Sequence, residues 1–237
     1  MKNTYIFDVD GTLAPPNEPI DSHFMHWLES WIPKRDVYIC TNNTYQNILP
    51  RLGNRLLSGC KALFTSGGCS IWMNGKEAIT SNWRPTSELM NMLTDCLKES
   101  EFKIRSGPNL EYRTGLISFS IVGKNASKED RQRYIAWDKN SKERRKIVEK
   151  INEAFPSLIA CTAGETSVDI CEKGKDKSQI LKYFDEYQSI NFIANETHSI
   201  GNDKPLAQAM YNNKNKRYNV QTVKNWKETF DYLRKVS

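Results

Sequence analysis

The sequence has no apolar run that approaches the roughly 18 residues needed to cross a bilayer. Its first apolar stretch, Tyr5-Ile6-Phe7, meets a charge at Asp8, so it lacks the long apolar core of a signal peptide. Basic residues are scattered along the chain, and nothing matches a nucleic-acid-binding signature. We therefore expect a soluble, cytoplasmic protein that binds neither nucleic acid nor membranes.

Paired cysteine motifs are also missing. None of the six cysteines stands in a Cys-x-x-Cys pair, and no histidine lies near enough in sequence to indicate a zinc module. Cys40, Cys161 and Cys171 lie in or beside apolar runs, where a reduced cysteine packs as a small hydrophobe. This pattern favours free thiols in a reducing compartment.

The chain does have enough length and apolar content for a substantial core, with 237 residues of which 38% are hydrophobic and 26% charged. That composition fits one large domain or two small ones and excludes a disordered or fibrous chain. The formal net charge of +6 suits an anionic substrate, but it suits a merely soluble surface as well.

Short apolar runs alternate with amphipathic stretches through the first third of the chain. The apolar runs predict strands at residues 5–7, 37–40 and 62–64. The stretches between them predict two helices, one with Phe24, Leu28 and Trp31 on its apolar face and one marked by Ile48, Leu52 and Leu56. Such alternation is typical of a parallel sheet that is covered on both faces.

Residues 82–172 have a different pattern, in which strands look half-exposed and helices are grouped between them. A helix is predicted at 87–97, followed by strands at 116–121, 157–160 and 167–170, with two charged helices after the first of these strands. This grouping predicts an antiparallel sheet with helices on one face.

The last part of the chain returns to the first pattern. Its predicted elements are helix 177–184, strand 190–193, helix 205–210, strand 218–220 and helix 226–233. We therefore predict an α/β fold with a Rossmann-like parallel-sheet core, residues 1–81 and 173–237, interrupted by an inserted α/β cap on an antiparallel sheet, residues 82–172.

The strongest chemical signal is Asp8-Val9-Asp10-Gly11-Thr12-Leu13, which directly follows the first strand. Two carboxylates at the carboxyl edge of a parallel sheet can hold a hard cation and still supply a nucleophile and a general acid/base. Asp-Gly between apolar runs also marks hairpin turns, but a helical segment follows here instead of a partner strand.

These residues resemble the first motif of the haloacid dehalogenase superfamily of phosphotransferases. The later motifs of that superfamily have counterparts in the same order: Thr41 after the second strand, Lys177 at the start of a later helix, and the loop from Asn195 to Asp203. The resemblance implies that Asp8, Asp10, Thr41 and Lys177 are catalytic. A hydroxyl and a lysine there would bind and neutralise a phosphoryl group.

The cap region extends the resemblance to the eukaryotic-type phosphomannomutases, along nearly the whole chain. The segments Glu111-Tyr112-Arg113-Thr114-Gly115, Ile121-Val122-Gly123-Lys124, Ser127-Lys128-Glu129-Asp130-Arg131 and Gly164-Glu165-Thr166-Ser167-Val168-Asp169 are similar to that family's substrate-binding segments. The resemblance implies that Arg113, Lys124 and Arg131 bind the phosphate that is not transferred. It also implies that Ser167 and Asp169 hold sugar hydroxyls.

The resemblance further implies a Mg²⁺ site formed by Asp8, Asp10, Asn195 and Asp203. Asn195 stands where that pattern has an aspartate, which removes one negative charge, although an amide oxygen can still bind Mg²⁺. Lys124 stands where the pattern has an arginine and supplies charge without a planar fork. We interpret His198 as a loop residue, because imidazole suits Mg²⁺ poorly.

The leading hypothesis is a Mg²⁺-dependent phosphomannomutase that forms an aspartyl phosphate on Asp8 and is primed by a hexose 1,6-bisphosphate. A sugar-phosphate phosphatase and a catalytically weakened sugar-phosphate-binding protein stay open as alternatives. The resemblance also implies a homodimer formed through the cap.

Overall fold

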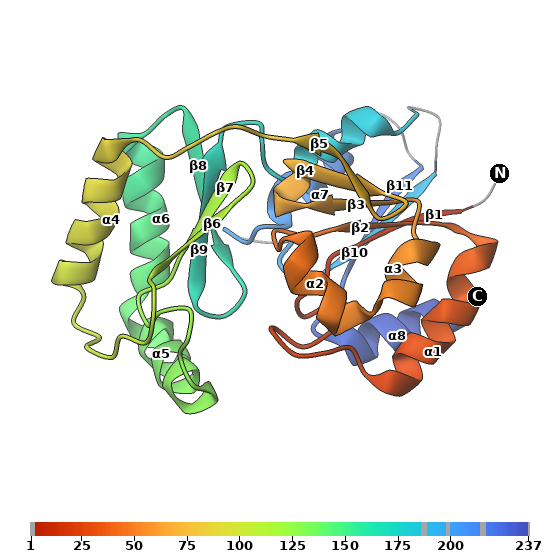
Figure 1. The fold of residues 1–237 in the computed structure, drawn as a ribbon, viewed down its shortest axis with the longest axis horizontal. Helices are drawn as coiled ribbons and strands as arrows, with labels where there is room; N and C mark the ends of the chain where they lie inside the picture. The colour runs from red at the N-terminus through yellow and green to blue at the C-terminus, as the bar shows by residue number, and fades with distance from the viewer. Residues whose placement is uncertain (1–2, 186–188, 198–199, 214–216, 237) are drawn as a thin grey trace.

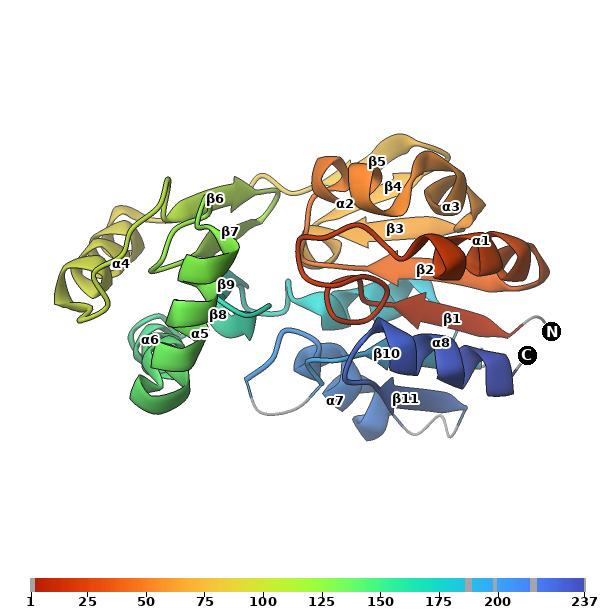
Figure 2. The ribbon, with the colours of Figure 1, turned by 90° about the horizontal axis from the view of Figure 1, so that it is seen from below.

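The protein is described by a computed structural model that covers residues 3–185, 189–197, 200–213 and 217–236 (Figure 1). Two β-sheets lie side by side, and each has its own helices (Figures 1 and 2). One sheet is mainly parallel and the other is antiparallel. The predicted fold class is therefore confirmed.

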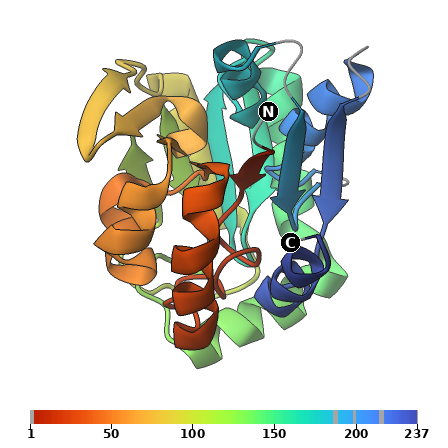
Figure 3. The ribbon, with the colours of Figure 1, turned by 90° about the vertical axis from the view of Figure 1, so that its right-hand side faces the viewer.

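The larger sheet contains seven strands among the described residues. From one edge to the other they are β11 (Tyr218–Thr222), β10 (Ile190–Ala194), β1 (Thr4–Phe7), β2 (Asp36–Cys40), β3 (Ala62–Thr65), β4 (Ser70–Met73) and β5 (Lys76–Thr80). The first five are parallel, whereas β4 and β5 add an antiparallel hairpin (Figure 3). This sheet and its helices are called the core below.

Helices cover both faces of the core sheet, as the alternation of the sequence predicts. One face packs against α1 (Ser22–Trp31), η1 (Ile32–Lys34), α2 (Tyr45–Leu52), α3 (Asn54–Gly59) and α8 (Trp226–Lys235). The opposite face packs against η3 (Lys177–Tyr183) and α7 (Lys204–Asn212). Alternate strand residues serve the two faces: Phe7 contributes to the first apolar cluster and Ile6 to the second.

The smaller sheet, with its helices, is called the cap below. Its strands, in spatial order, are β6 (Leu110–Arg113), β7 (Leu116–Phe119), β9 (Ser167–Glu172) and β8 (Leu158–Ala163), and its helices are α4 (Ser87–Glu99), α5 (Lys128–Ser141) and α6 (Glu143–Ala154). The helices pack on one face and enclose an apolar cluster with Ile117, Val168 and Ile170.

The opposite face of the cap sheet carries polar side chains. Strand β9 alternates between the two environments: Val168 and Ile170 join the apolar cluster, whereas Ser167 and Asp169 border a cavity. The two-residue period of a strand therefore places the cap's candidate binding residues on one surface.

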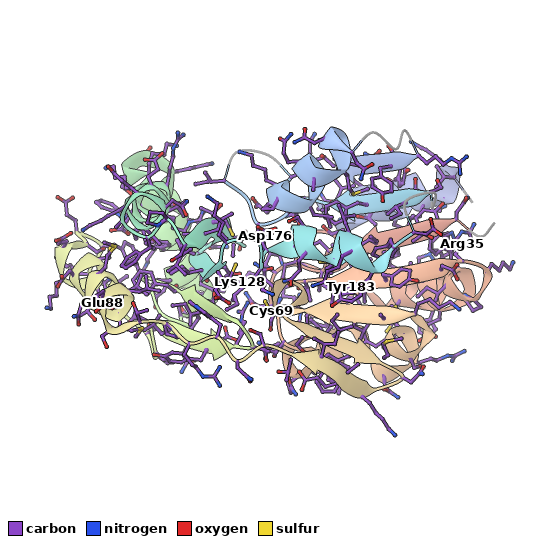
Figure 4. The ribbon with its side chains drawn as sticks, turned by 90° about the horizontal axis from the view of Figure 1, so that it is seen from above. Arg35, Cys69, Glu88, Lys128, Asp176 and Tyr183 are labelled. Carbon is purple, nitrogen blue, oxygen red and sulfur yellow. The ribbon has the colours of Figure 1, made fainter. Side chains whose placement is uncertain are left out.

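Hydrogen bonds join the cap to the loops at the carboxyl ends of the core strands. Asn42, two residues beyond β2, donates from Nδ2 to Asp169 Oδ2 at 2.8 Å. Thr162 of β8 donates its amide to the Ile200 carbonyl at 2.9 Å. Figure 4 places Cys69 and Asp176 at the same junction. The carboxyl edge of the parallel sheet therefore faces the polar surface of the cap.

Some predicted elements differ from the observed ones, each for a local reason. The single helix expected across Ile48 and Leu56 is two helices, because Gly53 adopts a φ of 76° between them. The helix expected at 177–184 is a 3₁₀ helix. Asp176 Oδ1 accepts from Ser178 N and the Asp176 carbonyl accepts from Gln179 N, which imposes a tight first turn. The strand expected at 116–121 ends at Phe119.

Three strands among the described residues, β4, β5 and β6, were not expected from the sequence. All side chains of β5 are exposed, and β6 contains no fully buried residue, so neither strand shows the apolar alternation that identifies a half-buried strand.

The structure also bears on what the sequence predicted about cysteines and membrane spans. All six cysteines are free thiols. No helix within the described ranges combines the length and the apolar character that a membrane span requires.

A buried hydrogen bond joins the last helix to the loop after β1, and its loss should destabilise the fold. Thr229 Oγ1 donates to the Thr12 carbonyl at 2.7 Å. We expect Thr229→Val to lower the free energy of unfolding by about 1–3 kcal/mol, because a buried carbonyl loses its donor. The matched control Thr94→Val, at an exposed threonine, should cost about 0.5 kcal/mol or less. Urea unfolding of both variants measures the difference, and equal effects would contradict the assignment.

Candidate active site

A buried lysine lies between two carboxylates at the centre of the site. Lys177 Nζ contacts Asp8 Oδ1 and Asp203 Oδ1, each at 2.6 Å, and the lysine side chain has no exposed surface. Asp8 directly follows β1, Lys177 begins η3, and Asp203 precedes α7. Three segments far apart in the sequence therefore meet at the carboxyl edge of the core sheet.

One cation shared by two carboxylates leaves this group short of positive charge. Burial raises the pKa of Asp8 to about 7, and the neighbouring Asp203 charge adds to the shift. Burial acts to lower the pKa of Lys177, but the Asp203 and Asp8 carboxylates together raise it well above its ordinary value. Lys177 is thus held as a cation against Asp8.

Asp8 retains one carboxylate oxygen for chemistry. Its Oδ1 is taken by Lys177, whereas Oδ2 has a 3.4 Å contact from the Thr12 hydroxyl. Asp8 also borders a cavity of about 410 Å³ between the core and the cap. Asp8 Oδ2 is therefore the oxygen placed to act as a nucleophile.

Asp10 also borders this cavity and is held on both of its oxygens. Oδ1 accepts from Arg51 Nη2 at 2.7 Å and from the Asn17 amide at 3.3 Å, and Oδ2 accepts from Asn43 Nδ2. Thr41, at 1% exposure, lies beside Asn43 and accepts its amide hydrogen at 3.2 Å. Asp10 is therefore a fixed carboxylate two residues from the nucleophile.

Asn195 packs directly over the turn after β1. Gly11 has a φ of 79°, and a Cβ at that position would overlap the Asn195 amide. Asn195 Oδ1 is buried and accepts no hydrogen bond from the described residues. A buried amide oxygen beside two carboxylates is an unused acceptor that could bind a cation.

The carboxylates near Asp8 fit a hard cation such as Mg²⁺ if the amide oxygen of Asn195 also binds it. Within the described ranges, no group of three or more His, Cys, Asp and Glu side chains is gathered to hold a metal ion. Asp203 has both oxygens engaged, Oδ1 by Lys177 and Oδ2 by the Glu196 amide at 3.0 Å. Asp203 is also the one of the four predicted ligands that does not border the cavity, so the residues that would hold Mg²⁺ are Asp8, Asp10 and Asn195.

Arg113 of β6 lies on the cap side of the cavity, with its side chain only 9% exposed. It contacts Glu111 Oε2 at 2.6 Å and donates to the Asn42 carbonyl at 2.8 Å. Its Nε is buried and donates to no described residue. Arg113 therefore joins the two sheets and retains one donor.

Lys124, Ser167 and Asp169 form a second polar group on the cap. Lys124 Nζ donates to Ser118 Oγ at 2.8 Å and to Ser167 Oγ at 3.1 Å, and Ser118 in turn donates to Asp169. Burial, followed by the nearby Arg113 charge, lowers the pKa of Lys124 to about 8. Arg131, in the first turn of α5, also borders the cavity.

The structure therefore brings most of the predicted site residues to one cavity. These are Asp8, Asp10, Thr41, Arg113, Lys124, Arg131, Ser167, Asp169 and Asn195. Lys177 and Asp203 do not border it and lie behind Asp8. His198 lies outside the described residues.

Sequence reasoning missed the residues that hold Asp10. Asn43 was visible beside Thr41, because it stands in the same loop after β2. Arg51 had no comparable signal, since it reaches Asp10 only after the loop between β1 and α1 folds back against α2. Glu111 and Ser118 were likewise missed, although both share the inward-facing register of the cap strands.

Comparisons of the sequence with known proteins find phosphomannomutases. The family model described as eukaryotic phosphomannomutase matches residues 34–236. A phosphomannomutase of Dendrobium officinale is 27% identical over 212 residues, which cover 86% of this chain and 84% of that protein.

Solved structures with the same fold include phosphatases. An IMP-bound IMP-nucleotidase of Plasmodium falciparum has a TM-score of 0.65 at 14% identity, covering 99% of this chain and 68% of that one. The C-terminal domain of a C. albicans trehalose-6-phosphate phosphatase has a TM-score of 0.65 at 12% identity, covering 98% of this chain and 90% of that one.

The fold and its relatives thus define a sugar-phosphate phosphotransferase of the haloacid dehalogenase superfamily. Within that superfamily, the chain belongs to the eukaryotic phosphomannomutase family.

The lowered pKa of Lys124 predicts that phosphate binding weakens in alkaline solution. The charged groups that act on Lys124 are Arg113, Asp169, Glu111 and Arg131. Lys124 is cationic below pH of about 8 and neutral above it, whereas a sugar phosphate is already a dianion above pH of about 6. In an Asp8→Asn background without turnover, we expect the affinity for mannose 1-phosphate to fall about tenfold between pH 7 and pH 10.

Lys124→Arg should bind with little dependence on pH over this range, because a guanidinium stays protonated. Lys139→Arg, on the exposed surface of α5, should keep the pH dependence of the parent. Calorimetric titrations at several pH values measure both variants. A Lys124→Arg profile that matches the parent would show that another group is responsible.

Proposed function

We propose that this enzyme is a Mg²⁺-dependent phosphomannomutase that interconverts mannose 6-phosphate and mannose 1-phosphate through an aspartyl phosphate on Asp8. The observation that carries the proposal is that residues of the core and of the cap border the same cavity. The cavity is bordered on one side by Asp8 and Asp10 and on the other by Arg113, Lys124 and Arg131.

In the first half-reaction, Asp8 Oδ2 attacks the phosphorus of a hexose bisphosphate. A bond forms between Asp8 and phosphorus while the bond from phosphorus to the sugar oxygen breaks. Asp10 donates the proton that the leaving oxygen needs. Lys177, held against Asp8, offsets the negative charge around the nucleophile.

In the second half-reaction, Asp10 accepts the proton of a hexose monophosphate hydroxyl. That oxygen bonds to phosphorus, and the bond from phosphorus to Asp8 breaks, which regenerates a hexose 1,6-bisphosphate. When bound, Mg²⁺ would supply positive charge to the transferring phosphoryl group. Arg113, Lys124 and Arg131 are placed to bind the phosphate at the other end of the sugar.

The cap supports a transfer between sugars, because it borders the cavity on the side opposite Asp8. Its hydrogen bonds to Asn42 and Ile200 hold it against the core, which limits the access of water as a competing acceptor. The free thiols fit the reducing, cytoplasmic setting that we propose for this reaction.

An assay of both products tests the proposed reaction. The enzyme is incubated with mannose 1-phosphate, Mg²⁺ and a hexose 1,6-bisphosphate, and mannose 6-phosphate and free phosphate are followed together. We expect the isomer to form in large excess over phosphate, and Asp8→Asn to reduce its rate at least about a thousandfold. Phosphate release without the isomer would identify a phosphatase instead. Binding of the sugar phosphate with neither product would identify a binding protein.

The proposed metal site is tested by binding rather than activity. Asn195→Asp adds a negative charge to the oxygen set, so we expect the affinity for Mg²⁺ to rise about tenfold in calorimetric titration. The control Asn82→Asp adds the same charge at an exposed position and should change the affinity little. An unchanged affinity in Asn195→Asp would place the metal elsewhere.

A further inference from the structure

Arg51 is a charged residue that borders the cavity, and the proposed reaction assigns it no role. It lies in the last turn of α2, and its side chain is only 11% exposed. An arginine that is so nearly buried and that pairs with an aspartate of the cavity is not an ordinary surface residue.

The guanidinium contacts three acceptors on one segment of chain. Nη2 donates to Asp10 Oδ1 at 2.7 Å and to the Pro15 carbonyl at 3.1 Å, and Nε donates to the Glu18 carbonyl at 3.0 Å. All three acceptors belong to the loop between β1 and α1. Arg51 therefore fixes the loop and the carboxylate together.

Asp10 stands on a loop and its side chain is 23% exposed, so its orientation depends on the contacts that its carboxylate makes. Arg51 holds one of its oxygens, and Asn43 holds the other. With both oxygens fixed, the carboxylate has a defined position beside Asp8. General acid catalysis requires such a position, because the acid must lie within hydrogen-bond reach of the leaving oxygen.

We propose that Arg51 is a positioning residue that orients Asp10 for proton transfer to and from the sugar oxygen. This assignment rests on the proposed function, because it requires Asp8 to be phosphorylated and Asp10 to act as its acid and base. The planar fork is needed, since Nε and Nη2 reach different acceptors at once, whereas a lysine offers a single point of charge.

Leaving-group chemistry distinguishes positioning of the acid from general support of the fold. Transfer from a sugar phosphate needs a proton on the leaving oxygen, but transfer from p-nitrophenyl phosphate does not, because nitrophenolate leaves without one. The rapid burst of nitrophenolate therefore reports attack by Asp8 alone. Phosphorylation by a hexose 1,6-bisphosphate, followed by rapid quench, reports attack together with proton donation.

The variants are Arg51→Gln, Arg51→Lys, Asp10→Asn and the double variant Arg51→Gln/Asp10→Asn. The matched control is Arg55→Gln, which removes an exposed arginine from the neighbouring helix α3. We expect Arg51→Gln to slow phosphorylation by the bisphosphate about a hundredfold while slowing the nitrophenolate burst by about threefold or less. Arg51→Lys should recover only part of the loss, and Arg55→Gln should match wild type.

The double variant tests whether the two residues act as one unit. If Arg51 acts through Asp10, the double variant phosphorylates no more slowly than Asp10→Asn, within about threefold. The assignment would be overturned if the rate losses of the two single variants multiplied in the double variant. It would also be overturned if Arg51→Gln slowed phosphorylation by the bisphosphate and by p-nitrophenyl phosphate equally. The Asp8→Asn variant distinguishes a wrong assignment of Arg51 from a wrong proposed function. A burst that persists without Asp8 contradicts the aspartyl phosphate itself.

Discussion

The ion pairs of Lys177 with Asp8 and Asp203 are the interaction on which the site depends. A lysine with no exposed surface is costly to bury, and the two carboxylates at 2.6 Å offset that cost only while both stay in place. The pairs join the end of β1, the start of η3 and the loop before α7. The fold of the core and the placement of its nucleophile are therefore held by the same contacts.

Hydrogen bonds extend this arrangement to the cap. Asn42 contacts both Asp169 and Arg113, and these are residues to which the family resemblance gives a role in holding the sugar and its phosphate. A molecule that enters the cavity meets side chains that already bind one another across the two sheets. Substrate binding and the fit of the cap against the core are for this reason coupled through the same few polar groups.

The sequence was informative wherever a local pattern had a fixed geometric meaning. The motifs after the first two strands predicted that Asp8, Asp10 and Thr41 meet at one edge of a parallel sheet. The half-exposed strand predicted at 167–170 agrees with β9, which buries Val168 and Ile170 and turns Ser167 and Asp169 to the cavity. Contacts that depend on how loops fold back could not be predicted in this way. Arg51 reaches Asp10 through such a loop, Gly53 divides a helix by a positive φ, and Asp203 turns toward Lys177 and away from the cavity.

The most direct test of the account is the covalent state of the protein during turnover. Wild-type enzyme mixed with a hexose 1,6-bisphosphate and Mg²⁺, quenched in acid and measured as intact protein by mass spectrometry, should gain the mass of one phosphoryl group. Peptide mapping should locate this group on Asp8. An unmodified protein under conditions of active turnover, or a phosphoryl group on any other residue, would contradict the account.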